Sequence, residues 1–347
     1  MLHLPAIPQI DVSASAEAAQ RQAQLTKPAG SLGQLETLSM QLAAISGNPR
    51  PSVARKGVII MAGDHGVTRE GVSAYPSEVT PQMVLNFLRG GAAINVLARQ
   101  AGARVVVVDI GVFSDLPDLP GLLRRKVARG TANMAQGPAM TRDQAAQAIQ
   151  TGIEVVQAEI DAGLDLVATG DMGIGNTTPS AAMVAAFTGL PVRQVTGRGT
   201  GLDDTGLDRK VAIIERALQV NQPDPRDGMD VLSKVGGLEI AGLAGVILGA
   251  AARRVPVVVD GFISGAAALA AAELCPEVKP YLIAAHQSVE IGHRAILERL
   301  GLRPLINLDL RLGEGTGAAL AFHLIEGAAR ILNEMATFAE AGVSAKE

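Results

Sequence analysis

The chain has 347 residues, a formal net charge of −4 and a pI near 5.8, and hydrophobic residues make up 48% of it. This acidic balance argues against nucleic acid or an anionic membrane surface as a partner, and the hydrophobic fraction argues against disorder. A single cysteine, Cys275, excludes an intrachain disulfide and a cysteine-based metal cage. The length predicts one large domain with an accessory part, or two domains.

Neither of two apolar stretches has the pattern of a targeting or membrane segment. Residues 2–10 are interrupted by a histidine and two prolines, so no secretory signal is visible. The most apolar stretch, 236–252, carries Glu239 and falls short of the roughly 20 residues that span a membrane. We therefore expect a buried helix at 236–252 and a cytoplasmic protein without a membrane span.

Helical patterning marks the first part of the chain. Residues 14–25 are good helix formers, and residues 34–46 place leucine and isoleucine at helical spacing. The turn between them, 26–33, is polar and contains two glycines and a proline. By its spacing alone, this turn is either a plain connector or a loop that reaches a site.

Beyond residue 50, short apolar runs alternate with helical patterns. Runs of strand length occur at 57–62, 103–109, 164–169, 256–260, 281–285 and 305–310. Helical patterns occur at 80–100, 141–162, 181–187, 211–220, 236–252 and 320–340, with Thr80 and Thr141 as the expected N-caps of the first two. This alternation predicts an α/β fold with a mostly parallel, doubly wound sheet.

The helical patterns at the two chain ends lie outside this alternation. We expect them to pack together as a small helical domain formed by residues 1–50 and 321–347. A large α/β domain, residues 51–320, would then carry the active site. In such sheets ligands bind beyond the carboxyl ends of the strands.

Nearly every predicted strand ends in a polar or glycine-bearing turn. The ionisable residues at these ends are Asp64, His65, Asp109, Asp171, Asp260, His286 and Glu314. Because the carboxyl ends of parallel strands meet at one edge, we expect these residues to form the rim of an active site.

The most informative turn follows the third predicted strand and reads TGDMGIGNTTPSAA (169–182). A strand, a glycine turn and a helix in succession bring backbone N–H groups and a helix N-terminus toward an anion. Gly173 and Gly175 allow close approach of a ligand, while Asn176 and Thr177 add side-chain donors. The turn lacks the G-x-G-x-x-G dinucleotide pattern and a Walker lysine, so we expect it to bind the phosphate of a smaller ligand. An ordinary capped turn is the alternative.

A second glycine-rich segment, TGRGTGLDDTGLDRK (196–210), supplies the only cluster of glycines and basic residues on the predicted rim. Gly199 and Gly201 lie in it, and Lys210 ends it. A charge-assisted hydrogen bond from Lys210 to a phosphate would contribute about 1.5–3 kcal/mol. Lys210 is either such a phosphate partner or a solvated lysine.

The motif GEGTG (313–317) places Glu314 between glycines at the start of a helix. A carboxylate without neighbouring side chains can be approached by a flat substrate. The alternative is a capping carboxylate stabilised by the helix dipole, an effect of about 0.3–1 kcal/mol. A cap needs no flanking glycines, and three glycines in this stretch favour a functional Glu314.

The histidines show no metal-binding pattern. Asp64 and His65 are compatible with a metal or an acid–base pair, but neither HxH nor HExxH spacing occurs. There is also no GxSxG elbow. We therefore expect no metal and no cofactor.

Five motifs together resemble one enzyme family. They are KPAGSLGQLE (27–36), GDHGV (63–67), GDMGIGNTT (170–178), GRGTGLDD (197–204) and RLGEGTGAAL (311–320). In this order they resemble the nicotinate-nucleotide:dimethylbenzimidazole phosphoribosyltransferases, which make α-ribazole phosphate for the lower ligand of cobalamin.

The resemblance implies a Rossmann-like parallel sheet, a small domain built from both chain ends, and a homodimer. It implies transfer of ribosyl phosphate from nicotinate mononucleotide to dimethylbenzimidazole in a single displacement. By resemblance, Glu314 is the catalytic base, Asp171 stands where the family more often has an assisting glutamate, and Lys210 matches a family lysine. These two substrates are the expected partners.

The slot for the aromatic base has to be apolar with one polar end, because dimethylbenzimidazole is flat and apolar except for its nitrogens. We expect Tyr75, Pro76 and Met83 as its walls, with Leu312 beside Glu314. Tyr75 covering the sheet edge is the alternative.

Two other classes of protein would also use a glycine-rich anion site. A sugar or nucleoside kinase would need Mg²⁺ and a nucleoside triphosphate, and a non-catalytic regulator would bind the mononucleotide without turnover.

Overall fold

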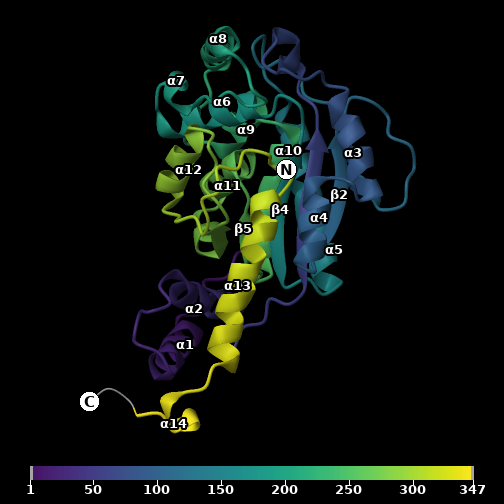
Figure 1. Ribbon diagram of the computed structural model, residues 1–347. Coiled ribbons are helices and arrows are strands. Elements are labelled where there is room, and N and C mark those ends of the chain that lie inside the picture. Colours follow the sequence, from purple (N-terminus) through teal and green to yellow (C-terminus); the bar gives the residue numbers. More distant parts are fainter. Residues whose placement is uncertain (1–2, 345–347) are drawn as a thin grey trace.

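The computed structural model describes residues 3–344 and is built around a six-stranded parallel sheet (Figure 1). Its strands are β1 (Lys56–Gly63), β2 (Arg104–Gly111), β3 (Leu122–Arg124), β4 (Leu166–Met172), β5 (Val257–Val259) and β6 (Leu282–Ala284). The spatial order is β3-β2-β1-β4-β5-β6, and every pairing is parallel. The chain therefore builds the sheet outward in both directions from β1 and β4, which confirms the predicted Rossmann-like α/β class.

Helices cover both faces of the sheet. The amino-terminal half contributes α1 (Val12–Gln24), α2 (Gln34–Ser46), α3 (Val79–Arg89), α4 (Ala93–Gln100) and α5 (Arg142–Asp161). The remaining helices are α6 (Thr177–Thr188), α7 (Val192–Val195), α8 (Asp204–Asn221), α9 (Gly228–Val235), α10 (Leu238–Ala252), α11 (Phe262–Leu274), α12 (Gly292–Leu300), α13 (Thr316–Glu334) and α14 (Phe338–Ala341). Two short 3₁₀ helices span Gly66–Glu70 and Pro276–Tyr281.

Alternate residues of each strand enter two separate cores, as the period of a strand requires. Ile59 and Met61 of β1 pack with helices α5, α6 and α8–α12. Val58 and Ile60 pack on the other face with α2, α3, α4 and α13. Because both faces are covered, the strands read as continuous apolar runs.

The stretch predicted to be a buried helix is α10, all but one of whose residues are buried. It packs closely against α5, because a Cβ on Gly245 would lie 2.0 Å from the carbonyl oxygen of Ile149. Small residues at this crossing explain how a chain with 2% aromatic residues fills a large core. Within the described residues, no helix combines the length and the apolar character needed to cross a membrane.

Three sequence predictions were wrong in detail. The helix expected at 80–100 is two helices, because Gly90 adopts a left-handed conformation (φ 76°) and ends α3. Thr80 lies inside α3 instead of capping it, and Glu78 occupies the N-cap position. The strand expected at 305–310 reduces to one bridge between Ile306 and His286. Strand β3 was not predicted, because it is a partly exposed edge strand that ends in Arg124 and so shows no apolar run.

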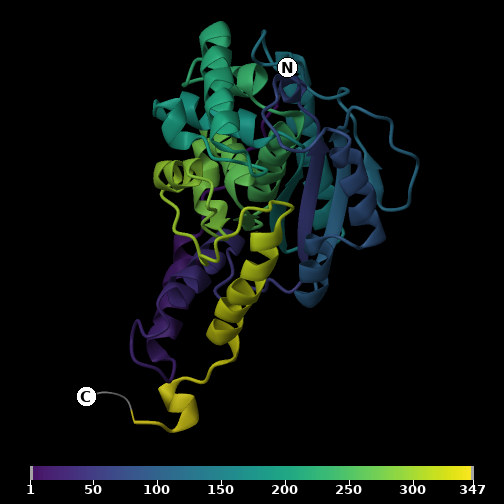
Figure 2. The ribbon, with the colours of Figure 1, turned by 45° about the horizontal axis from the view of Figure 1, so that its top comes forward.

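The helices from the two chain ends do pack together (Figure 2). Helix α2 contacts both α1 and α13. However, α13 is continuous across the predicted boundary at residues 320/321, and its Phe322 and Ile325 belong to the core under the sheet. The division into two domains stays a prediction, and its residues 1–2 and 345–347 lie outside the described residues.

Candidate active site

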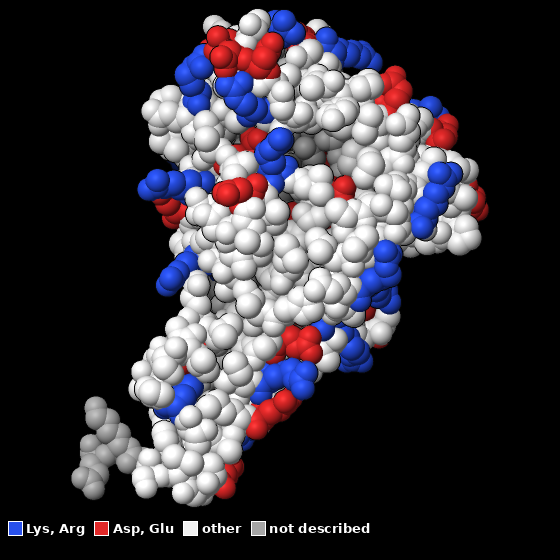
Figure 3. All heavy atoms as spheres, in the orientation of Figure 1, with Lys and Arg blue, Asp and Glu red and all other residues white. Residues whose placement is uncertain are grey.

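A cavity of about 520 Å³ opens at the carboxyl end of β4, where the strand order changes direction. In the space-filling view a hollow in the upper half of the molecule has acidic and basic atoms around it (Figure 3). Segments far apart in sequence line it, drawn from residues 75–83, 171–177, 199–200, 260–263, 286–290 and 311–314. Ligands of doubly wound sheets bind at such a switch point.

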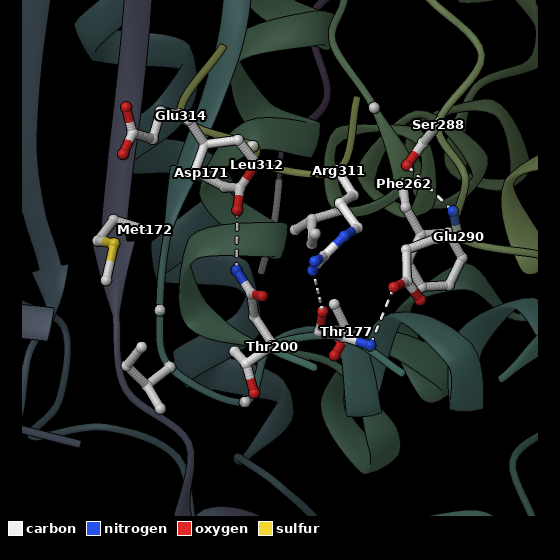
Figure 4. Close-up of a pocket in the computed structure, with 18 of the residues that line it drawn as sticks. Asp171, Met172, Thr177, Thr200, Phe262, Ser288, Glu290, Arg311, Leu312 and Glu314 are labelled. Atoms are coloured by element: carbon white, nitrogen blue, oxygen red, sulfur yellow. Dashed lines mark hydrogen bonds between the residues drawn. The ribbon is translucent and has the colours of Figure 1, made fainter. Parts of the chain in front are cut away.

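Glu314 lies at one end of this cavity (Figure 4). It is the centre of a left-handed turn, with φ values of 82° at Gly313, 63° at Glu314 and 90° at Gly315. The glycines adopt this conformation freely, whereas for a side-chain-bearing residue it costs about 1–2 kcal/mol. Strain of this kind is retained where the surrounding structure imposes it, which is common at functional sites.

Asp260, at the end of β5, imposes the turn. Its carboxylate accepts hydrogen bonds from the N–H groups of Gly315 (3.3 Å) and Ala318 (2.9 Å), at the start of α13. Asp260 therefore caps α13, and the alternative that Glu314 is the cap of its own helix is wrong. Glu314 instead accepts a hydrogen bond from the N–H of Ile94 in α4 at 3.3 Å.

Burial raises the pKa of Glu314 above its ordinary value, and the negative charge of Asp260 raises it further. The Ile94 N–H opposes this shift without cancelling it. A carboxylate with a raised pKa is a stronger base once it is ionised. The side chain is only 5% exposed, so a ligand would reach it from within the cavity.

Asp171 lies next to this turn, at the end of β4. A Cβ on Gly313 would lie 3.1 Å from its Oδ1. Burial is the main reason that the pKa of Asp171 rises to about 8, and the nearby Asp260 charge adds to it. The side-chain amide of Asn176 donates to Asp171 Oδ2 at 2.9 Å and opposes the shift. Asp171 is therefore mostly protonated at neutral pH.

The glycine turn predicted from the sequence lines the cavity. Gly173, Gly175, Asn176 and Thr177 all contribute to its wall, and α6 begins at Thr177. Gly175 has a φ of 86°, the left-handed conformation that favours glycine. The turn therefore exposes backbone to the cavity at a helix N-terminus, as an anion site requires.

Lys210 lies behind this wall and does not line the cavity. It is fully buried, so the alternative of a solvated lysine is wrong. Its Nζ donates to Thr177 Oγ1 at 2.7 Å and to the carbonyl oxygen of Gly197 at 3.2 Å. Burial lowers its pKa to about 8, while the charge of Glu290 acts in the opposite direction. Of the two glycines predicted with it, Gly199 lines the cavity and Gly201 does not.

Glu290 and Arg311 line the cavity but were not among the predicted site residues. Glu290 lies at the opposite end of the view from Glu314, with Arg311 between them (Figure 4). Both hold Gly199: Glu290 Oε1 accepts its N–H at 2.9 Å, and Arg311 Nη1 donates to its carbonyl at 3.1 Å. Arg311 begins the RLGEGTGAAL motif and was recognisable as a basic residue near its glycines. Glu290 follows a three-residue strand and carried no signal.

Three of the four residues predicted for the aromatic base line the cavity. Tyr75 and Met83 come from the region of α3, and Leu312 precedes the Glu314 turn. Pro76 does not line it. Tyr75 is 56% exposed and Leu312 58% exposed, so both stand at the mouth.

The structure brings only some of the ionisable residues predicted at the strand ends into one cavity. Asp171, Asp260, His286 and Glu314 line the cavity, whereas Asp64, His65 and Asp109 do not. Asp109 lies 3.2 Å from Lys126 Nζ in an ion pair. Across residues 3–344, no group of three or more His, Cys, Asp or Glu side chains is arranged to hold a metal ion.

The sheet order, the cavity at the switch point and the buried carboxyl groups with shifted pKa values together define an α/β enzyme. A family model described as "Phosphoribosyltransferase" matches residues 7–343. The chain is 65% identical to the nicotinate-nucleotide–dimethylbenzimidazole phosphoribosyltransferase of Chloroflexus aggregans, over 97% of this chain and 96% of the relative. It is 62% identical to the enzyme of that name from Geobacter sulfurreducens, over 96% and 95% of the two chains.

Among solved structures, CobT from Thermus thermophilus superimposes with a TM-score of 0.93 at 52% identity, over 96% of this chain and all of that chain. The chain therefore belongs to the family of nicotinate-nucleotide–dimethylbenzimidazole phosphoribosyltransferases.

Proposed function

We propose that this protein transfers the ribosyl phosphate group of nicotinate mononucleotide to a ring nitrogen of 5,6-dimethylbenzimidazole. The products are α-ribazole 5′-phosphate and nicotinate, a step of cobalamin nucleotide-loop synthesis. Family membership supports the reaction class. The observation that carries the mechanism is Glu314, held in a strained turn at one end of the cavity with a raised pKa.

The reaction is a single displacement at the ribose C1′. The benzimidazole nitrogen attacks C1′, and the bond from C1′ to the pyridinium nitrogen breaks, returning its electron pair to that nitrogen. Nicotinate leaves with a neutral ring nitrogen, so the leaving group needs no proton. Glu314 takes the proton from the attacking imidazole, and general-base assistance of this kind contributes about 10²–10⁴ in rate.

Asp171 assists as a neutral group. With a pKa of about 8 it carries a proton at pH 7 and adds no negative charge beside the incoming phosphate. Its hydrogen bond with Asn176 also ties the Glu314 end of the cavity to the glycine turn. The shorter aspartate side chain is compatible with this indirect role.

The phosphate binds at the glycine turn. Gly173, Gly175 and Thr177 offer N–H groups, and Gly199 lies next to Thr177, because a Cβ on it would be 2.7 Å from Thr177 Oγ1. Lys210 acts through Thr177. Its Nζ donates to the threonine hydroxyl oxygen, so the proton of that hydroxyl is available to donate to the phosphate. Arg311 supplies a guanidinium group that lines the cavity directly.

The aromatic base occupies the end of the cavity near Glu314. Met83 and Leu312 supply apolar contacts there, and Tyr75 closes the mouth. An apolar slot keeps water from Glu314 and is consistent with its raised pKa.

The protein acts as a homodimer in the cytoplasm. Supporting the dimer, five large apolar side chains stay exposed on the segments around the cavity mouth: Tyr75, Val289, Ile291, Leu308 and Leu312. Apolar groups gathered in this way mark interaction surfaces. Light scattering behind a size-exclusion column is expected to give twice the 35.7 kDa chain mass, and a monomer mass at micromolar concentration would contradict the dimer.

One assay tests the reaction against the two alternatives. The protein is incubated with nicotinate mononucleotide and dimethylbenzimidazole in EDTA, and free nicotinate is measured by chromatography. Catalytic release of nicotinate in EDTA supports the transferase and excludes a Mg²⁺-dependent kinase. Binding of the mononucleotide without turnover would instead identify a regulator.

A further inference from the structure

The motif GDHGV (63–67) lies directly beneath the glycine turn, and the reaction described above uses none of its side chains. A Cβ on Gly173 would lie 2.3 Å from the carbonyl oxygen of Gly63 and 3.2 Å from His65 Nε2. The backbone of the turn therefore rests on this motif. The two segments are adjacent because they follow β1 and β4, the paired strands at the centre of the sheet.

His65 forms a buried ion pair with Glu239, the residue that made the apolar stretch of α10 unusual. His65 Nε2 lies 2.8 Å from Glu239 Oε1, and neither side chain is more than 1% exposed. Burial alone would lower the pKa of His65, but Glu239 and Asp64 raise it on balance. Glu239 and Asp64 therefore favour the protonated imidazole, which lies immediately behind the turn.

A second contact holds the turn from α3. The N–H of Ile174 donates to Thr80 Oγ1 at 3.1 Å. Asp64 of the motif lies beside Thr80, and its Oδ2 accepts the N–H of Phe113 at 2.8 Å. Two successive residues of the turn, Gly173 and Ile174, are thus held from below.

We propose that His65 and Glu239 are positioning residues that hold the turn 173–175 in the conformation that binds the nucleotide's phosphate. The proposal rests on the proposed function, because it takes this turn as the phosphate site. A glycine turn samples many conformations unless its surroundings restrict it.

Stability alone does not explain the pair. Replacing a buried ion pair with well-packed apolar residues is often neutral or stabilising, whereas removing one partner is destabilising. A buried pair therefore contributes little net stability by itself. The pair lies directly behind the turn that is proposed to bind the phosphate. A role in restricting that turn explains this location.

The test separates positioning from folding. The double variant His65→Leu/Glu239→Leu removes both charges and both polar groups, so no charge is left uncompensated. The milder Glu239→Gln keeps the volume and removes only the carboxylate. The control is the ion pair between Lys56, the buried first residue of β1, and the partly exposed Glu326 (2.5 Å), at the end of the strand remote from His65. It is replaced as Lys56→Met/Glu326→Leu.

We expect the double leucine variant to raise both the KM and the calorimetric Kd for nicotinate mononucleotide about tenfold, because small misplacements of binding groups have effects of this size. Glu239→Gln is expected to raise both in the same direction by a smaller factor. The KM for dimethylbenzimidazole stays within about twofold. The control changes the Tm without changing either KM.

An unchanged nucleotide KM and Kd in both Glu239 variants would overturn the positioning role. Equal increases in the KM of both substrates would overturn it too, since that pattern reports general disturbance. The variant Gly175→Ala tests the phosphate site itself. A Cβ at this position would lie 2.7 Å from Thr68 Cγ2, and the backbone φ is 86°, so the substitution should distort the turn. If Gly175→Ala also leaves nucleotide binding unchanged, the phosphate does not bind at this turn.

Discussion

The two ends of the cavity are built on opposite principles. The Glu314 end is acidic and strained: three consecutive left-handed residues carry a carboxylate with a raised pKa, next to Asp171 and Asp260. The glycine-turn end is unstrained and rich in donors, with Thr177 joined to the buried Lys210. In the proposed function, the Glu314 end performs the proton transfer and the glycine-turn end holds the nucleotide. Variants at each end should therefore have separable kinetic effects.

The largest effect is expected from Glu314→Gln. The amide keeps the size of the side chain but accepts no proton, so kcat should fall by about 10²–10⁴. The KM for nicotinate mononucleotide should change little, because the glycine-turn end is untouched. Steady-state rates of nicotinate release measure both quantities. Turnover close to that of the unmodified protein would show that another group is the base.

The next largest effect is expected from Lys210→Met at the other end. Methionine keeps the length of the side chain and removes the charge and the hydrogen bond to Thr177. The KM for the nucleotide should rise about tenfold, since one charge-assisted hydrogen bond contributes about 1.5–3 kcal/mol. Lys234→Met, which removes a partly exposed partner of Asp230, is the matched control. A larger rise in the KM for dimethylbenzimidazole would place the phosphate elsewhere.

A pH series distinguishes the two carboxyl groups. Glu314 works as its anion, so kcat should fall with decreasing pH through a midpoint above the ordinary pKa of glutamate. Asp171 loses its proton as the pH rises through about 8, and the new negative charge should then raise the KM for the nucleotide. Lys210, whose pKa is also about 8, loses its charge over the same range, so Asp171→Asn should reduce this alkaline rise to the part due to Lys210 and leave the acid limb in place. An alkaline rise of undiminished size in Asp171→Asn would show that Asp171 does not contribute to it.

The smallest effect is expected from Met83→Ala, which widens the aromatic slot. The loss of kcat/KM should be a few-fold greater for dimethylbenzimidazole than for unsubstituted benzimidazole, because one or two methyl contacts contribute about 1–3 kcal/mol. Competition between the two bases in a single reaction measures the ratio. Equal losses on both would place the methyl groups against a different wall.

Much of the fold and of the site was predictable from the sequence, for identifiable reasons. Strands covered on two faces give continuous apolar runs, and the glycines of 173–175 and 313–315 are required by left-handed backbone or close approach. The partly exposed edge strand β3 ends in a charged residue and shows no apolar run, which is why it was missed although the equally short, buried β5 and β6 were predicted. The capping role of Asp260 and the contacts of Glu290 depend on pairing between distant segments, which one sequence does not show.

The burial of Lys210 was also invisible in the sequence. Aspartate and arginine precede it, and this local pattern is that of a solvated helix face. Only the tertiary structure shows that its turn of α8 faces Thr177 and Gly197. The burial of Lys210 excludes the alternative of a solvated lysine. Its role in binding the phosphate stays a prediction.

The most direct test of the division between the two ends is calorimetric titration of nicotinate mononucleotide into Glu314→Gln and Lys210→Met, in the absence of the aromatic base. Glu314→Gln is predicted to bind the nucleotide with the affinity of the unmodified protein although its turnover is lost. Lys210→Met is predicted to bind it about tenfold more weakly. If Glu314→Gln loses nucleotide affinity and Lys210→Met keeps it, the two ends do not have the separate roles assigned to them.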